Sequence, residues 1–148
     1  MKYIVLISPK IQANNLSLLK SIEMLNYKNI KEISTNKIYA FKGNIGKKEI
    51  YKIADVLLVD PIVEVFSIVQ KIRSIKDSTI VNIWYRPEVL DVEALYISKA
   101  IKYINIKDNL EIHSGISLKF TPKLKKEVVA DIIKSLFMNP LIQYYEII

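Results

Sequence analysis

The stretch LFMNPLIQYYEII, residues 136–148, has an earlier counterpart in LLVDPIVEVFSI, residues 57–68. Pro61 and Pro140 lie 79 positions apart, and at this offset Asp60 aligns with Asn139. The same offset keeps apolar positions aligned as far upstream as Ile22 and Ile101. Unrelated segments would not keep apolar positions in step over about 65 residues, so we infer a tandem duplication.

The two copies are expected to differ near their starts. Pro9 aligns with Pro87, and Val5 with Ile83, at an offset of 78. This shift predicts one residue gained or lost at the start of the first helix, where a loop tolerates it. We therefore expect two units, residues 1–68 and 78–148, with a short connection over 69–77. Units this small bury little surface alone, so each is expected to pack against the other.

Each unit is predicted to open with a strand and a helix. KYIVLIS (2–8) and TIVNIWY (79–85) are rich in β-branched and aromatic residues and are followed by a proline. Asp91 stands at the N-cap position of a helical pattern in the second unit, and Asn14 or Asn15 takes this place in the first.

The rest of each unit predicts a long strand, a second helix and a final strand. Asn36 and Gly115 occupy equivalent places in the long strands and predict a bulge or bend there. Thr121 and Pro122 are read as N-cap and first residue of the last helix. Proline disfavours helix in the preceding residue, so the second helices should end before Pro61 and Pro140. The pattern β-α-β-α-β predicts an α+β fold close to a ferredoxin-like layout, with helices on one side of the sheet.

Composition excludes several classes of function. The chain has 148 residues, no cysteine, one histidine (His113) and three glycines. These counts exclude disulfides and thiolate chemistry, and no phosphate-loop motif occurs. We expect no catalytic residue, metal site or cofactor. The apolar run after Met1 is too short for a signal peptide, and no stretch approaches the roughly 20 apolar residues of a membrane span. A soluble, cytoplasmic protein without a membrane partner is expected.

The net charge of +7 has two interpretations. It could mark a surface that binds polyanions, or it could reflect codon usage that favours lysine. Only Arg73 and Arg86 among the 22 basic residues are arginines. Specific nucleic-acid readers usually rely on the bidentate guanidinium, so the second interpretation is favoured.

Several segments resemble the PurS family, the small subunit of phosphoribosylformylglycinamidine (FGAM) synthase in purine biosynthesis. Arg86-Pro87-Glu88-Val89-Leu90-Asp91 resembles the family's Lys-Pro-Gly-Val-x-Asp segment. Ser114-Gly115 resembles the family's turn, and LFMNPLI (136–142) its last helix end. The first unit lacks the Val-x-Asp part, and neither unit has glycine after its first proline.

The resemblance implies a function without catalysis. PurS-like subunits pair, bridge a glutaminase subunit and an ATP-dependent synthetase subunit, and help ammonia pass between them. A tandem would mimic a PurS dimer in one polypeptide. The partner contacts implied by motif position are Arg86, Pro87, Asp91, Asn139 and Pro140. Glutaminase and synthetase subunits of FGAM synthase are the expected partners, together with possible self-association.

Two alternatives remain open at this point. The chain could be a ferredoxin-like regulatory domain that binds a small metabolite between its units, in which case a defined ligand should raise the melting temperature. A basic nucleic-acid-binding module is the weaker alternative, and its affinity should fall steeply with salt.

Overall fold

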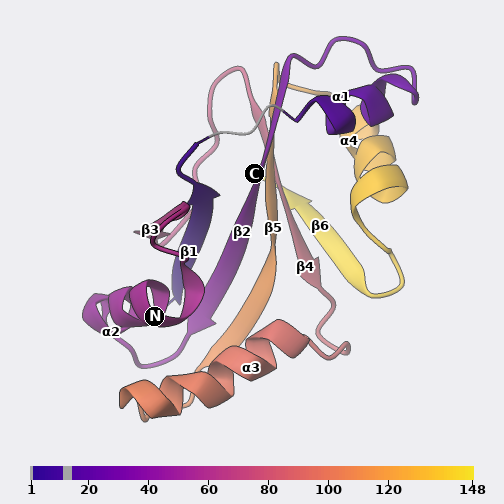
Figure 1. Cartoon of the computed structure of the whole chain (residues 1–148). Coiled ribbons are helices and arrows are strands. Elements are labelled where there is room, and N and C mark those ends of the chain that lie inside the picture. Colours follow the sequence, from indigo (N-terminus) through magenta and orange to yellow (C-terminus); the bar gives the residue numbers. More distant parts are fainter. Residues whose placement is uncertain (1, 12–14) are drawn as a thin grey trace.

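The computed structural model describes residues 2–11 and 15–148. Two sets of three strands and two helices follow one another along the chain (Figure 1). In the first set the elements are β1 (Lys2–Pro9), α1 (Leu16–Glu23), β2 (Glu32–Lys42), α2 (Lys47–Ile53) with a π-helical turn η1 (Ala54–Leu58), and β3 (Glu64–Val69). In the second they are β4 (Thr79–Tyr85), α3 (Val92–Ala100) with a 3-10 turn η2 (Ile101–Ile104), β5 (Glu111–Thr121), α4 (Lys126–Ile132) with a π-helical turn η3 (Ile133–Phe137), and β6 (Gln143–Ile147).

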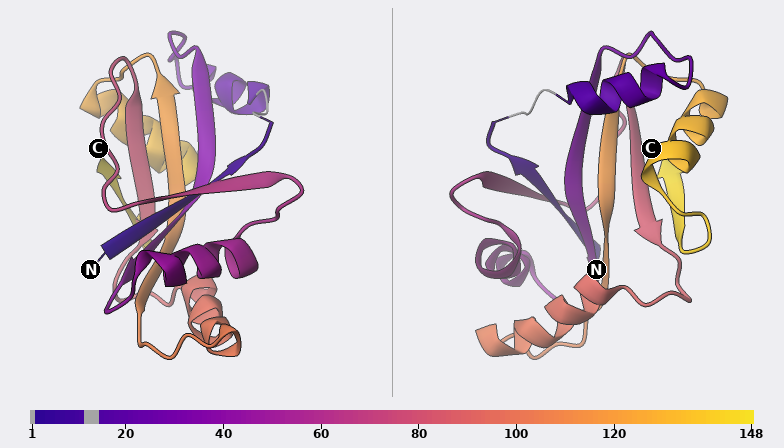
Figure 2. Two further views of the ribbon diagram at one scale, coloured as in Figure 1. Left: turned by 90° about the vertical axis from the view of Figure 1, so that its left-hand side faces the viewer. Right: turned by 45° about the vertical axis from the view of Figure 1, so that its right-hand side comes forward.

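All six strands form one antiparallel sheet in the order β3-β1-β2-β5-β4-β6. The sheet is strongly twisted, so that β1 and β3 run at a steep angle to β4 and β5 (Figure 2). The predicted α+β class is confirmed. Each unit contributes three strands, and its middle strand is a single continuous run of 11 residues.

The two units are arranged symmetrically about the centre of the sheet. β2 and β5 begin and end 79 positions apart, and they pair antiparallel from Glu32↔Thr121 to Lys42↔Glu111. Lys37 pairs with Ile116, its own counterpart at that offset. Equivalent positions can face each other in an antiparallel pair only at a twofold axis, so a local pseudo-twofold axis passes between these two residues.

The first strands align differently from the prediction. Val5 pairs with Tyr39, and Val81 pairs with Leu118, the counterpart of Tyr39. The offset is therefore 76 in these strands, and the predicted equivalence of Val5 with Ile83 is wrong. Asn26 and Asn105 follow the first helix of each unit, and both have positive φ. They lie 79 positions apart, so the offset is again 79 after the helices. The second unit therefore has three more residues than the first between its first strand and this asparagine. Three residues are almost one helical turn, so α3 is longer than α1 while its apolar face still points towards the sheet.

The helices pack on one face of the sheet and are exchanged between the units. Ile22 of α1 is buried among second-unit residues such as Val81 and Ile132. In the other core cluster, Ile97 of α3 is buried among first-unit residues such as Val5 and Ile50. Consequently α1 lies beside α4, and α3 lies beside α2 (Figure 1). Each half of the core therefore contains side chains from both units.

The opposite face of the sheet carries a smaller apolar cluster. Ile38 and Trp84 are buried there, and Ile72 packs against them. Ile72 belongs to the segment 70–78, which connects β3 to β4 and which we call the strap. β3 extends through Val69, one residue beyond the predicted end of the first unit. Within the described residues, no helix is both long and apolar enough to cross a bilayer.

Local predictions had mixed outcomes. Asp91 is the N-cap of α3, and both second helices end before the prolines, as predicted. Thr121 is instead the last residue of β5, and α4 begins only at Lys126, so the prediction that Thr121 and Pro122 start this helix is wrong. Asn15 is the N-cap of α1 but its side chain donates to the Ile33 carbonyl oxygen at 2.7 Å; Asn14 lies outside the described residues.

The predicted bulge at Asn36 and Gly115 is also wrong, because both strands pair without interruption. Gly115 is needed for a different reason. A Cβ there would collide with the carbonyl oxygen of Ile83 and lie 3.0 Å from Cε3 of Trp84. Glycine in a strand often marks such a close approach of a second backbone.

Gly115→Ala should lower the free energy of unfolding by about 2 kcal/mol or more, because the collision involves backbone that cannot move without opening β4 from β5. Gly46→Ala is the matched control, since the atom its Cβ would meet is the end of the flexible Glu49 side chain. Urea denaturation measures the free energy of unfolding of both variants. Equal stability of the two variants would contradict this reason for Gly115.

Residues 78–148 expressed alone should give no folded monomer. α3 would leave Ile97 and Ile101 without the first-unit core in which they are buried. Circular dichroism with light scattering would test this expectation: either an unfolded chain or a self-associated species agrees with it. A cooperatively folded monomer would show that the exchanged helices are dispensable.

Candidate partner interface

Four of the five predicted contact residues lie together at one end of β4. The backbone N–H of Arg86 donates to the Ile142 carbonyl oxygen at 2.9 Å, and its side-chain Nε donates to the Pro140 carbonyl oxygen at 2.9 Å. Pro87 follows Arg86 directly and is exposed. The guanidinium group thus ties the loop after β4 to the turn that precedes β6.

That turn is held by hydrogen bonds of the Asn139 side chain and backbone. Asn139 Oδ1 accepts from the Leu141 backbone N–H at 3.0 Å, and the Asn139 N–H donates to Gln143 Oε1 at 3.0 Å. An asparagine that bonds its own backbone two residues on stabilises this kind of turn. The turn presents Leu141, whose side chain is 82% exposed. We call Arg86, Pro87, Asn139, Pro140 and Leu141 the second corner.

The first unit builds the same arrangement from different residues. The backbone N–H of Lys10 donates to the Val63 carbonyl oxygen at 2.8 Å, and its Nζ donates to the Pro61 carbonyl oxygen at 2.6 Å. Asp60 Oδ1 accepts from the Ile62 N–H at 3.1 Å, and Ile62 is 81% exposed. We call Lys10, Asp60, Pro61 and Ile62 the first corner.

Asp91, the fifth predicted contact, is engaged inside the fold. Its Oδ1 accepts from the Ala94 backbone N–H at 2.9 Å and from Ser114 Oγ at 2.7 Å. Its Oδ2 accepts from the Ser114 backbone N–H at 2.7 Å. The carboxylate therefore caps α3 and fixes that helix to β5, where the Ser114-Gly115 pair lies.

Sequence reasoning missed Lys10, Ile62 and Leu141. The usable signal was a large aliphatic residue directly after the proline in both copies, where a turn exposes it. An exposed aliphatic residue held in a rigid turn beside a cation is suited to protein contact, because interfaces combine an apolar centre with a polar rim. The two corners recur in the two units and so form a pair of related surfaces.

Glu111 and Tyr39 are among the described residues whose pKa is shifted by neighbouring groups or burial. His113 contacts Glu111 Oε1 through Nε2 at 2.7 Å, and this hydrogen bond, together with nearby Lys42, lowers the pKa of the exposed Glu111 carboxyl. Burial, and then the hydrogen bond to Glu93, raises the pKa of the Tyr39 hydroxyl. No group of three or more histidine or carboxylate side chains with metal-binding geometry occurs within residues 2–11 and 15–148.

Asp91→Ala should lower the free energy of unfolding by about 2–4 kcal/mol, because it removes a helix cap and leaves the backbone N–H and hydroxyl of the buried Ser114 without an acceptor. Asp60→Ala, in the exposed turn of the first corner, should cost about 1 kcal/mol or less. Urea denaturation compares the free energies of unfolding of the two variants. A loss for Asp91→Ala no larger than that for Asp60→Ala would contradict the structural role.

Comparison with known proteins adds one match. Residues 78–148 match the family described as PurS: Phosphoribosylformylglycinamidine (FGAM) synthase. No curated protein matches the chain. The matched segment contains every element from β4 to β6, including the second corner and the Asp91 cap. Residues 78–148, which make up the second unit, therefore belong to the PurS family.

Proposed function

We propose that the protein is a non-catalytic subunit of FGAM synthase in de novo purine biosynthesis, acting in the cytoplasm. In this role it bridges a glutaminase subunit and a synthetase subunit and assists ammonia transfer between them. The observation that carries the proposal is the match of residues 78–148 to the PurS family. The paired corners on one continuous sheet support a bridging role, because two partners need two contact surfaces.

The corners differ in ways that would let each select a different partner. The first has a lysine and the carboxylate of Asp60, whereas the second has a guanidinium and the neutral amide of Asn139. The exposed aliphatic residue is Ile62 in one and Leu141 in the other. Differences in charge around a similar apolar centre favour one partner and disfavour another.

The first unit is, in this proposal, a diverged second copy of the PurS unit, and the chain works as a fused pair. Separate subunits lose translational and rotational freedom when they pair, which costs several kcal/mol. A single polypeptide avoids this cost because the second pairing is intramolecular. The exchanged helices and the continuous β2–β5 pairing would then replace the dimer interface of a two-chain arrangement.

The test measures FGAM synthesis by the glutaminase and synthetase subunits of the same organism, with and without this chain. Glutamine-dependent turnover should require the chain, while ammonia-dependent turnover should require it far less, since free ammonia needs no delivery. If neither rate changes and the chain does not co-elute with either subunit, the proposed function is wrong.

Substitutions in the two corners test whether these surfaces contact the partner subunits. Leu141→Asp or Ile62→Asp should weaken binding of one partner by about 30-fold, the effect of losing a contact worth about 2 kcal/mol, and should lower glutamine-dependent turnover correspondingly. Met24→Asp is the matched control, because Met24 is an exposed aliphatic residue (84%) outside both corners. Equal effects of all three substitutions would argue against the corners as contact surfaces.

A further inference from the structure

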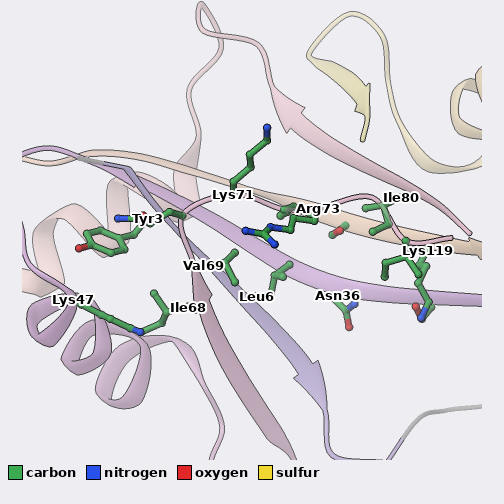
Figure 3. A pocket seen from close by; sticks show the side chains of 15 residues that line it. Tyr3, Leu6, Asn36, Lys47, Ile68, Val69, Lys71, Arg73, Ile80 and Lys119 are labelled. Atoms are coloured by element: carbon green, nitrogen blue, oxygen red, sulfur yellow. The ribbon is translucent and has the colours of Figure 1, made fainter.

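A cavity of about 1000 Å³ lies on the helix-free face of the sheet, beneath the strap (Figure 3). Its floor comes from four strands: Leu6 of β1, Asn36 of β2, Lys119 of β5 and Ile80 of β4. Residues 70–73 and Ile75 of the strap contribute to its wall. The cavity thus lies mostly on the face opposite the helices, where the strap passes from one unit to the other, and its lining also includes Lys47 at the start of α2.

The lining of the cavity is cationic. Lys47, Lys71, Arg73 and Lys119 belong to it, and no aspartate or glutamate does. Arg73 extends from the strap towards Leu6 and Val69, whereas Lys71 extends away from them (Figure 3). Like charges gathered without a counter-charge raise the local positive potential, which attracts an anion.

Two of these cations, Arg73 and Lys119, are not used by the fold. Neither Arg73 nor Lys119 forms an ion pair or side-chain hydrogen bond with any other residue in the described part of the chain. By contrast, Arg86, the other arginine, bonds the Pro140 carbonyl oxygen. A chain that uses lysine for almost all its positive charge therefore places a free guanidinium, the group suited to bidentate oxyanion contact, at this cavity.

An unpaired polar atom lies in the same lining. Asn36 Oδ1 is buried and has no hydrogen-bond partner. Buried polar atoms are normally paired, and an exception calls for a ligand, a water molecule or a strained environment. The cavity also has an apolar portion, formed by Leu6, Ile72, Ile75 and Ile80. Its lining therefore combines a cationic region, a hydrogen-bonding amide and an apolar wall.

We propose that this cavity binds a phosphorylated small metabolite of nucleoside-monophosphate size. The phosphate would pair with Arg73, a polar group of the ligand would bond Asn36, and its less polar body would lie against Ile72 and Ile80, with Lys119 adding positive charge at the far end of the lining. The volume is at the upper end of that of small-molecule sites, which leaves room for a ring system as well as a phosphate. A ligand held there would contact strands of both units and the strap between them.

The test uses the full chain with AMP, ribose 5-phosphate, adenosine and inorganic phosphate as probes, measured by calorimetry and thermal shift. AMP should bind and raise the melting temperature in a concentration-dependent way, while adenosine and inorganic phosphate should each bind at least about tenfold more weakly. Arg73→Ala should weaken AMP binding about tenfold or more, and Arg73→Lys should weaken it less.

Lys76→Ala is the matched control, because Lys76 is an exposed strap residue that does not line the cavity. It removes the same charge and should leave AMP affinity unchanged. Lys119→Met should weaken AMP binding by less than Arg73→Ala does, with unchanged circular dichroism as the check on folding.

Four results would overturn the proposal, the first three of which concern AMP and the variants. These three are no binding of AMP or ribose 5-phosphate at millimolar concentration, equal binding of AMP and adenosine, or equal losses from Arg73→Ala and Lys76→Ala. Binding of inorganic phosphate as tight as that of AMP would also overturn it, since the site would then recognise an anion alone. None of these measurements involves a partner subunit, so their outcome is independent of the proposed function.

Discussion

The antiparallel pairing of β2 with β5 is the interaction on which the rest of the structure depends. It joins two three-stranded sheets into one through an uninterrupted register centred on Lys37 and Ile116. Because this register places equivalent residues around a pseudo-twofold axis, it also decides where the helices can pack. Each first helix crosses to the neighbouring unit, and the core cannot be divided at the connection without exposing buried side chains.

Much of this arrangement could be predicted from the sequence. Pro61 and Pro140 stop their helices for a steric reason that acts locally, and Asp91 caps α3 through its own backbone neighbours. The offset in the first strands could not be fixed in the same way. Side chains alternate with a period of two, so offsets of 76 and 78 place the same residues on the same face, and only the pairing with β2 and β5 distinguishes them.

Long-range features escaped sequence reasoning for a related reason. An apolar helical stripe shows that α1 and α3 are buried, but it carries no information about which unit buries them. Gly115 was expected at a bend, yet its role depends on the carbonyl oxygen of Ile83 in another strand. The predicted contact residues include four of the five residues of the second corner. The fifth predicted residue, Asp91, instead bonds Ser114 inside the fold, and this contact depends on the three-dimensional arrangement.

The pair at the axis has a consequence for how freely the two halves can be rearranged. Lys37 faces Ile116, so a charge lies opposite a hydrocarbon. Two copies of the first half assembled in the same register would instead set Lys37 against Lys37, and directly opposed like charges destabilise a sheet. Two copies of the second half would meet Ile116 against Ile116 without that penalty. A single chain can hold a combination that self-pairing of its first half disfavours, so the two halves are not interchangeable.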